Sequence, residues 1–123
     1  TIGLVAISEA QRRHAPDLPW EGTVHNGVVV DDFPFRDRAA KEDCGTPVVA
    51  LRRGAVPEVV ADGISGLLCD RPAELPAAID RAVALNPARC RRHAREHFDV
   101  AVMAAGYERV YQRILTRVAA APA

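Results

Sequence analysis

The chain has 123 residues, which is enough for one compact domain and too few for two full-sized lobes. It is 49% hydrophobic and 26% charged, a balance typical of a folded protein rather than a disordered one. Sixteen basic residues offset sixteen acidic ones, so no overall positive field favours nucleic acid or an anionic membrane surface as a partner. Arginine makes up all of the basic residues except Lys41, and this bias indicates a high-GC bacterial genome.

The cysteines and the hydropathy pattern bear on the compartment. Cys44, Cys69 and Cys90 lie too far apart for zinc-ligand spacing, and their odd number fits a reducing environment. No apolar run approaches the roughly 18 residues that a membrane span requires, and the first residues lack the features of a signal peptide. We therefore expect a cytoplasmic protein with no metal site and no transmembrane segment.

The first predicted elements are a strand and a short helix. Residues 2–7 form a continuous apolar run, typical of a buried parallel strand. Ser8 followed by Gln11 forms a capping box, which predicts a helix that begins at Ser8. That helix must end before Pro16, because the residue ahead of a proline disfavours helical geometry.

Residues 16–30 are predicted to form a loop followed by two short strands with a turn between them. Residues 16–22 are predicted to be a loop, and residues 23–25 a second strand. Asn26-Gly27 is a turn signal, and residues 28–30 could form a strand after it.

A domain boundary is predicted in the polar stretch 31–42, which contains Pro34 and has neither a helical nor a strand period. We place the boundary near Arg38, which divides the chain into residues 1–38 and residues 39–123.

The segment after the boundary repeats the alternation of strand and helix. Residues 48–51 are apolar and rich in valine, which predicts a buried strand. Residues 57–61 suggest a single helical turn closed by Asp62-Gly63, and residues 66–69 a further short strand. Strands that alternate with helices indicate an α/β fold, with parallel sheet layers and flanking helices.

Three helices are predicted to complete the chain. The first begins at about Ala73, the second at the N-cap pair Asn86-Pro87, and the third at the capping residue Asp99. The predicted inward residues of the three helices are Leu75, Ala78, Ile79, Ala82 and Val83; Cys90, Ala94 and Phe98; and Met103, Tyr107, Val110, Tyr111, Ile114 and Val118.

Candidate chemistry lies at the carboxyl ends of the predicted strands, where parallel sheets bind ligands. In the loop 52–58, Gly54 permits close approach of a ligand, backbone amides could meet a phosphate, and Glu58 could accept hydrogen bonds from sugar hydroxyls. The residues alone favour a simpler interpretation, in which Arg52 and Arg53 are solvated and Glu58 stabilises the next helical turn through its dipole.

Other reactive side chains are better explained structurally. His93 and His97 stand four residues apart on a helix, but Arg92 and Arg95 beside them favour a solvent-facing pair over a metal site. Ser8 lacks the glycine-flanked elbow of serine hydrolases and is interpreted as a helix cap. Cys44 has no identifiable partner base. No catalytic residue can be named from these patterns.

Several stretches together resemble one family. Residues 44–50 (CGTPVVA) are the most specific, and the others are residues 7–11 (ISEAQ), 25–28 (HNGV), 54–60 (GAVPEVV), 62–68 (DGISGLL) and 107–111 (YERVY). In this order they resemble the retaining, two-lobed (GT-B) glycosyltransferases that transfer hexoses from nucleotide sugars. The resemblance implies that residues 1–38 are a remnant of the N-terminal lobe and interlobe crossover. Residues 39–123 would then be the later part of a Rossmann-like, nucleotide-sugar-binding C-terminal lobe.

The resemblance also implies a donor, an acceptor and a set of site residues. The donor would be a nucleoside diphosphate sugar, the acceptor an alcohol, and no metal or other cofactor is expected. The candidate substrate-binding residues are Gly45, Thr46, Arg52, Gly54 and Glu58, and the candidate interlobe residues are Asn26 and Gly27.

The chain departs from the family pattern between Arg38 and Cys44. The family has a long segment here that holds a phosphate-clamping Arg and Lys and the first Glu of a pair. The second Glu of that pair, which holds the ribose, corresponds to Ala40, and Glu42 would face another side of a helix. We therefore expect a truncated or incomplete enzyme that is a poor catalyst or none by itself.

The sequence is compatible with two further interpretations. In the first, the chain is a non-catalytic, degenerate glycosyltransferase-like module for binding or assembly, whose strand edges are covered by self-association or by a partner chain. In the second, the chain is an unrelated flavodoxin-like response domain, which the lack of an acidic cluster after the first strand disfavours.

Overall fold

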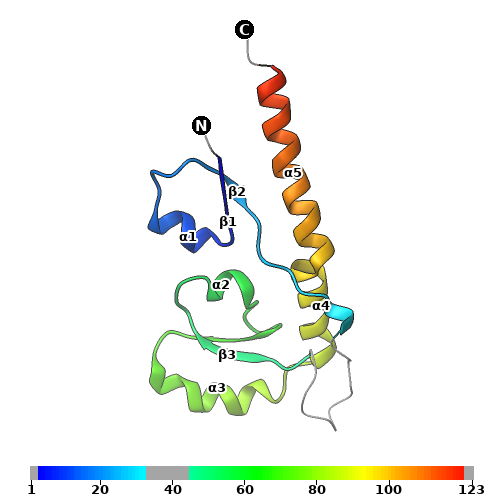
Figure 1. The fold of residues 1–123 in the computed structure, drawn as a ribbon. Coiled ribbons are helices and arrows are strands. Elements are labelled where there is room, and N and C mark those ends of the chain that lie inside the picture. The colour runs from blue at the N-terminus through cyan, green and yellow to red at the C-terminus, as the bar shows by residue number, and fades with distance from the viewer. Residues whose placement is uncertain (1–2, 33–44, 121–123) are drawn as a thin grey trace.

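The protein is described here by a computed structural model, which covers residues 3–32 and 45–120. Figure 1 shows two small groups of strands and helices joined by a long helical arm. In chain order the elements are β1 (Leu4–Ala6), α1 (Glu9–His14), β2 (Trp20–Thr23), η1 (Val30–Asp32), β3 (Val48–Leu51), α2 (Val56–Val59), β4 (Gly66–Cys69), η2 (Pro72–Glu74), α3 (Leu75–Ala82), α4 (Pro87–Phe98) and α5 (Val100–Ala119).

The described strands form two separate parallel pairs. β1 pairs with β2, and β3 pairs with β4, with Val48 opposite Gly66 and Leu51 opposite Cys69. Parallel neighbours need a crossover connection, which α1 supplies in the first pair and α2 in the second. The predicted mixed α/β fold with parallel strands is therefore confirmed at this level.

Helix α1 forms as its capping signal predicts. The Ser8 hydroxyl accepts a hydrogen bond from the Gln11 backbone N–H at 3.1 Å. The Gln11 side chain reaches back to the Ile7 backbone N–H at 2.9 Å, one residue earlier than in a standard capping box. The helix ends at His14, before Pro16.

The predictions for residues 16–30 were wrong in part. The second strand is Trp20–Thr23 instead of residues 23–25, so part of the expected loop is strand. Asn26-Gly27 does not form a turn, and residues 28–30 do not form a strand. The chain instead runs extended along the α4–α5 junction, where the Val28 N–H donates to Phe98 O at 2.8 Å and the Val100 N–H donates to Val28 O at 2.9 Å. These contacts outweigh the local turn preference.

Gly27 has a packing role in this extended segment. A Cβ added at Gly27 would lie 2.9 Å from the Asp99 carbonyl oxygen, the Val100 Cα and the Met103 Cβ. The Gly27 backbone N–H lies 3.2 Å from the Met103 sulfur. Glycine is therefore needed because the crossover approaches the first turn of α5 too closely for a side chain.

The second strand pair follows its sequence signals closely. β3 and β4 occupy the predicted ranges, and α2 is the predicted single turn. Gly63 has a φ of 75°, a left-handed conformation that favours glycine, and it leads the chain back into β4.

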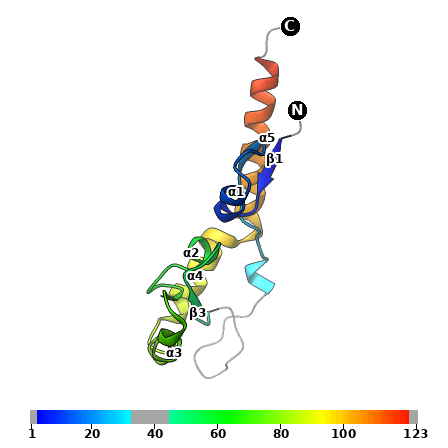
Figure 2. The same cartoon turned by 90° about the vertical axis from the view of Figure 1, so that its left-hand side faces the viewer.

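Helices α3, α4 and α5 begin near the predicted positions. The Asn86 side chain accepts from the Ala88 N–H at 2.9 Å, and the Asp99 side chain accepts from the Ala101 N–H at 3.0 Å. Helix α5 then runs from the second strand pair back to the first, as Figures 1 and 2 show from perpendicular directions. It packs on β2 there, with Gly106 against Val24.

The buried core is small. The buried apolar residues among those described are Ala6, Ala10, Val24, Val30, Val60, Cys69, Ala78, Ala82, Cys90 and Val110. The chain presents 8542 Å² of accessible surface, whereas a compact monomer of 13.3 kDa is expected to present about 6,500 Å². The molecule therefore leaves much more surface exposed than a compact domain of its mass.

Several positions that were predicted to be buried are exposed. Val48 of the expected buried strand is 48% exposed, and Ile79 and Val83 on the predicted inner face of α3 are 57% and 68% exposed. Tyr111 and Val118 of the α5 stripe are also exposed. A two-stranded sheet is too narrow to cover a full helical face, so only part of each stripe is buried: Ala78 and Ala82 in α3, Cys90 in α4 and Val110 in α5.

Within residues 3–32 and 45–120, no helix combines the length and the apolar character needed to cross a membrane.

Candidate functional site at the junction of the two strand pairs

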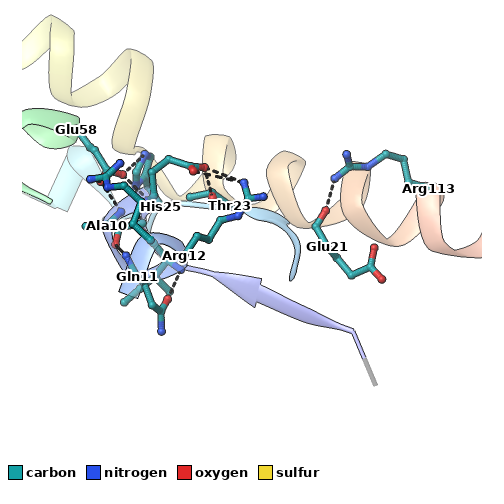
Figure 3. A network of polar contacts seen from close by, with 12 residues as sticks. Ala10, Gln11, Arg12, Glu21, Thr23, His25, Glu58 and Arg113 are labelled. Carbon is teal, nitrogen blue, oxygen red and sulfur yellow. Dashed lines mark hydrogen bonds and ion pairs between the residues drawn. The ribbon is translucent and has the colours of Figure 1, made fainter. Parts of the chain in front are cut away.

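Glu58 connects the two strand pairs. It lies in the single turn α2, and its side chain is 15% exposed. Its carboxylate accepts hydrogen bonds from the backbone N–H groups of Glu9, at 2.6 Å, and Ala10, at 2.8 Å. Figure 3 shows Glu58 next to Ala10. These two amides open helix α1 and have no acceptor within that helix. Glu58 therefore caps a helix that lies about fifty residues earlier in the chain.

Two basic side chains lie near the same carboxylate. Arg13 Nη2 is 3.7 Å from Glu58 Oε1, and His25 Nε2 is 3.9 Å from Glu58 Oε2. His25 Nδ1 lies 3.1 Å from the Ile7 carbonyl oxygen, so this nitrogen carries the proton, and the ring packs edge-on against Phe98. The carboxylate thus lies beside the positive N-terminal end of α1 and the Arg13 guanidinium.

A second carboxylate, that of Glu9, lies at the same end of α1. It accepts a hydrogen bond from the Thr23 hydroxyl and pairs with Arg12, whose Nη1 is 3.2 Å away. The hydrogen bond from Thr23, followed by the contact with Arg12, holds the pKa of Glu9 below its ordinary value. This network ties α1 to the end of β2.

The sequence left two interpretations of Glu58: its oxygens could accept hydrogen bonds from sugar hydroxyls, or, as the residues alone favour, it stabilises the next helical turn through its dipole. In the structure both oxygens accept backbone N–H groups of α1. A sugar at Glu58 would therefore have to share the carboxylate with these two amides.

Arg52 and Gly54 lie together in the loop that follows β3. Arg52 Nη2 is 3.1 Å from Asp62 Oδ2, and Arg52 Nε is 3.2 Å from Asp70 Oδ1. Gly54 has a φ of 56° and no other part of the chain within 4 Å of an added Cβ, so the loop needs glycine for its conformation. Arg52 is held by two carboxylates, while the space around Gly54 is open.

Asp62 is the centre of this loop cluster. Its Oδ1 accepts the Leu68 backbone N–H at 2.9 Å, and its other oxygen pairs with Arg52. The hydrogen bond from Leu68 is the main cause that lowers the pKa of Asp62, and Arg52 lowers it further. The hydrogen bond to Asp62 in turn raises the pKa of Arg52.

The lowered pKa of Asp62 predicts an acid-sensitive contribution to stability. A carboxylate whose pKa is lower in the folded chain stabilises the fold above its unfolded pKa, and this contribution disappears as the pH falls through the folded pKa. Because Asp62 is half exposed, we expect a contribution of at most about 1 kcal/mol. The melting temperature should therefore fall less steeply between pH 6 and pH 2.5 for Asp62→Asn than for the unchanged chain. Asp17→Asn, an exposed carboxylate without these partners, is the control and should leave the slope unchanged. Equal slopes for Asp62→Asn and the unchanged chain would contradict this prediction.

Gly45 and Thr46 lie at the other end of β3. With Val59, Cys90 and His93 they line a mainly apolar cavity of about 190 Å³. Because a strand rises about 3.3 Å per residue, Thr46 and Arg52 lie about 20 Å apart along the chain. The predicted substrate-binding residues therefore occupy three places: the amino end of β3, the loop after β3, and the contact between α2 and α1.

The remaining candidates have structural roles where they are described. Ser8 caps α1, and the free thiols Cys69 and Cys90 are buried. Burial raises the pKa of Cys90, and its sulfur donates to the Ile64 carbonyl oxygen at 3.3 Å. These contacts agree with the interpretation of both cysteines as core thiols. Cys44 and Ala40 lie outside the described residues.

The histidine pair on α4 does not form a metal site with other groups. The His93 and His97 rings are 4.7 Å apart, and His93 Nε2 lies 3.0 Å from the Val59 carbonyl oxygen. Across the part of the chain that the structure describes, no three His, Cys, Asp or Glu side chains gather as ligands.

The sequence analysis missed a basic groove on α5. Arg109, Arg113 and Arg117 line it together with Glu21 of β2. The available signal was the spacing of four residues between these arginines, which places all three on one side of a helix.

A search of protein-family models finds no match to this chain, and no curated protein matches it.

Proposed function

We propose that this chain is part of a retaining, two-lobed glycosyltransferase that uses a nucleoside diphosphate sugar as its donor. The proposal rests on the resemblance of residues 44–68 and on one structural observation. The strands before and after the 33–44 stretch lie in separate parallel pairs instead of sharing one sheet. Separate sheets are what two lobes of such an enzyme require.

The connections between the two pairs support the same assignment. Residues 24–30 cross extended from the first pair to the second, and α5 returns from the second pair to pack on the first. Under this proposal β3, α2 and β4 belong to the Rossmann-like, nucleotide-sugar-binding lobe. Asn26 and Gly27 then lie in the interlobe crossover.

The isolated chain should have little or no transferase activity. Departure of a nucleoside diphosphate needs positive charge on the phosphates, usually one of the largest catalytic effects. The Arg and Lys that supply this charge in the family have no counterpart in the sequence, and Ala40 stands where the ribose-holding Glu is expected. Loss of such a pair removes several kcal/mol of transition-state stabilisation, by roughly the usual scale of these groups.

A second candidate function is a non-catalytic binding or assembly module. The observation that favours it is the large exposed surface of 8542 Å², which includes exposed valines such as Val48 and Val83. Exposed strand edges and apolar helix faces are features that a partner chain could cover.

Titration with nucleoside diphosphates separates the two candidates. We expect one of UDP, GDP, ADP or CDP to raise the thermal stability of the chain, by about 2.7 kcal/mol at 100 times its dissociation constant. Under the same conditions no sugar transfer and no donor hydrolysis should be detected.

Substitutions at two neighbouring arginines test whether the nucleotide-induced shift depends on Arg52. Arg52→Gln should reduce the nucleotide-induced shift, whereas Arg53→Gln, at the next and exposed position, should leave it intact. No shift with any nucleotide would favour the assembly module, and measurable sugar transfer would contradict the expected lack of activity.

A further inference from the structure

A groove of about 900 Å³ lies between β2 and α5. Its walls include Trp20 and Glu21 of β2 and Val110 of α5. Small-molecule sites in proteins usually have volumes of about 300–1,000 Å³, so this groove is large enough for a small ligand. It is separate from Arg52, Gly54 and Glu58, so an inference from it is independent of the proposed glycosyltransferase function.

Three arginines line the α5 wall of this groove. Arg113 Nη2 donates to the Glu21 carbonyl oxygen at 2.9 Å, and Arg117 pairs with the Glu21 carboxylate. Figure 3 shows Arg113 extending toward Glu21 from the helix. Arg109 lines the same wall, and the contacts of the described chain give it no hydrogen bond or ion pair.

The groove therefore has an excess of positive charge in a chain whose net charge is zero. Three guanidinium groups face a single carboxylate, that of Glu21. Like charges four residues apart on a helix repel one another, and a bound anion would relieve that repulsion.

Trp20 supplies an apolar wall in a fixed position. Its indole N–H donates to the Ala15 carbonyl oxygen at 2.7 Å, which anchors the ring. It is the only tryptophan in the chain, so its fluorescence reports on this groove alone.

We propose that this groove binds a small soluble phosphate compound. The planar guanidinium matches a phosphate through two parallel hydrogen bonds, which an ammonium group cannot reproduce. Arg109 is the principal contact because it has no partner among the described residues, and Arg113 keeps further N–H groups for the ligand. Residues four apart on a helix rise by about 6 Å, so these two arginines suit two linked phosphates.

Titration with inorganic pyrophosphate, followed by Trp20 fluorescence at low and constant ionic strength, tests the proposal. A saturable fluorescence change is expected, and sodium sulfate at equal ionic strength should produce a clearly weaker one. Arg109→Gln should raise the apparent Kd about two- to fivefold, the usual scale for one exposed charged contact. Arg92→Gln, which removes the same charge from an exposed position of α4 outside the groove, should leave the Kd unchanged.

Four outcomes would overturn the proposal. They are no saturable change with pyrophosphate, an equal response to sulfate, equal weakening by Arg92→Gln and Arg109→Gln, or loss of pyrophosphate binding when phosphatidic acid vesicles are added. The last would assign the groove to a lipid headgroup. Arg109→Gln should retain any nucleotide-induced stabilisation that depends on Arg52, so failure of this proposal and failure of the proposed function are distinguishable.

Discussion

Replacing Glu58 by alanine is expected to lower the free energy of unfolding by about 2 kcal/mol. The substitution removes the acceptor for the Glu9 and Ala10 backbone N–H groups. Hydrogen bonds to a charged group contribute about 1.5–3 kcal/mol each when they are protected from solvent, and some of this is regained because water can hydrate a free helix end. The change can be measured by urea unfolding followed by circular dichroism.

One further variant isolates the effect of the Glu58 charge, and a second is a control at an exposed glutamate. Glu58→Gln keeps the length of the side chain and one acceptor oxygen, so we expect about half of the loss seen for alanine. Glu108→Ala, an exposed position on α5, should change stability by less than about 0.5 kcal/mol.

Amide hydrogen exchange provides a second readout of the same contact. Glu58→Ala should lose protection at the Glu9 and Ala10 N–H groups, while amides of α5 keep theirs. If protection at these two amides were the same with and without the Glu58 carboxylate, the contact between α2 and α1 would not exist in solution.

Replacing Gly66 by alanine is expected to have the largest effect among alanine substitutions of the described glycines. A Cβ at Gly66 would lie 2.1 Å from the Val48 carbonyl oxygen and 2.7 Å from Val60 Cγ1. The first contact is with backbone in the paired strand, so it cannot be relieved by rotating a side chain. We expect a loss of about 3 kcal/mol or more, with separation of β3 from β4.

Gly54→Ala is the matched control for this substitution. It adds the same methyl group where no other part of the chain lies within 4 Å, and its only cost is the positive φ of 56°. That cost is about 1 kcal/mol. Equal losses for Gly66→Ala and Gly54→Ala in urea unfolding would contradict the close approach of β3 and β4.

The helix starts were predictable because their signals are local. Ser8, Asn86 and Asp99 each accept a hydrogen bond from a backbone N–H two or three residues later. Such a bond depends only on the chain within one turn, so a side chain and its spacing suffice to predict it. The valine-rich strand β3 was predictable for a similar reason, since its apolar run follows Pro47 and ends at two charged residues, Arg52 and Arg53.

The sequence predicted which residues of the loop 52–58 belong to the candidate site, but it did not predict what they bind. The loop 52–58 was recognised from its glycine and its charges, but the partners of those charges were not. Arg52 binds two carboxylates that follow it by ten and eighteen residues, and Glu58 binds amides from the beginning of the chain. No spacing in the sequence records contacts over such distances.

The sequence by itself determined the class of the elements and the positions of the helix starts. Only the tertiary structure decided that the strands form two pairs, that Gly27 lies against α5 instead of in a turn, and that Glu58 caps α1. The physical reason is the same in each case. Local hydrogen bonds and steric preferences are properties of a few neighbouring residues, whereas pairing, close packing and long-range capping depend on the free energy of contacts between distant segments.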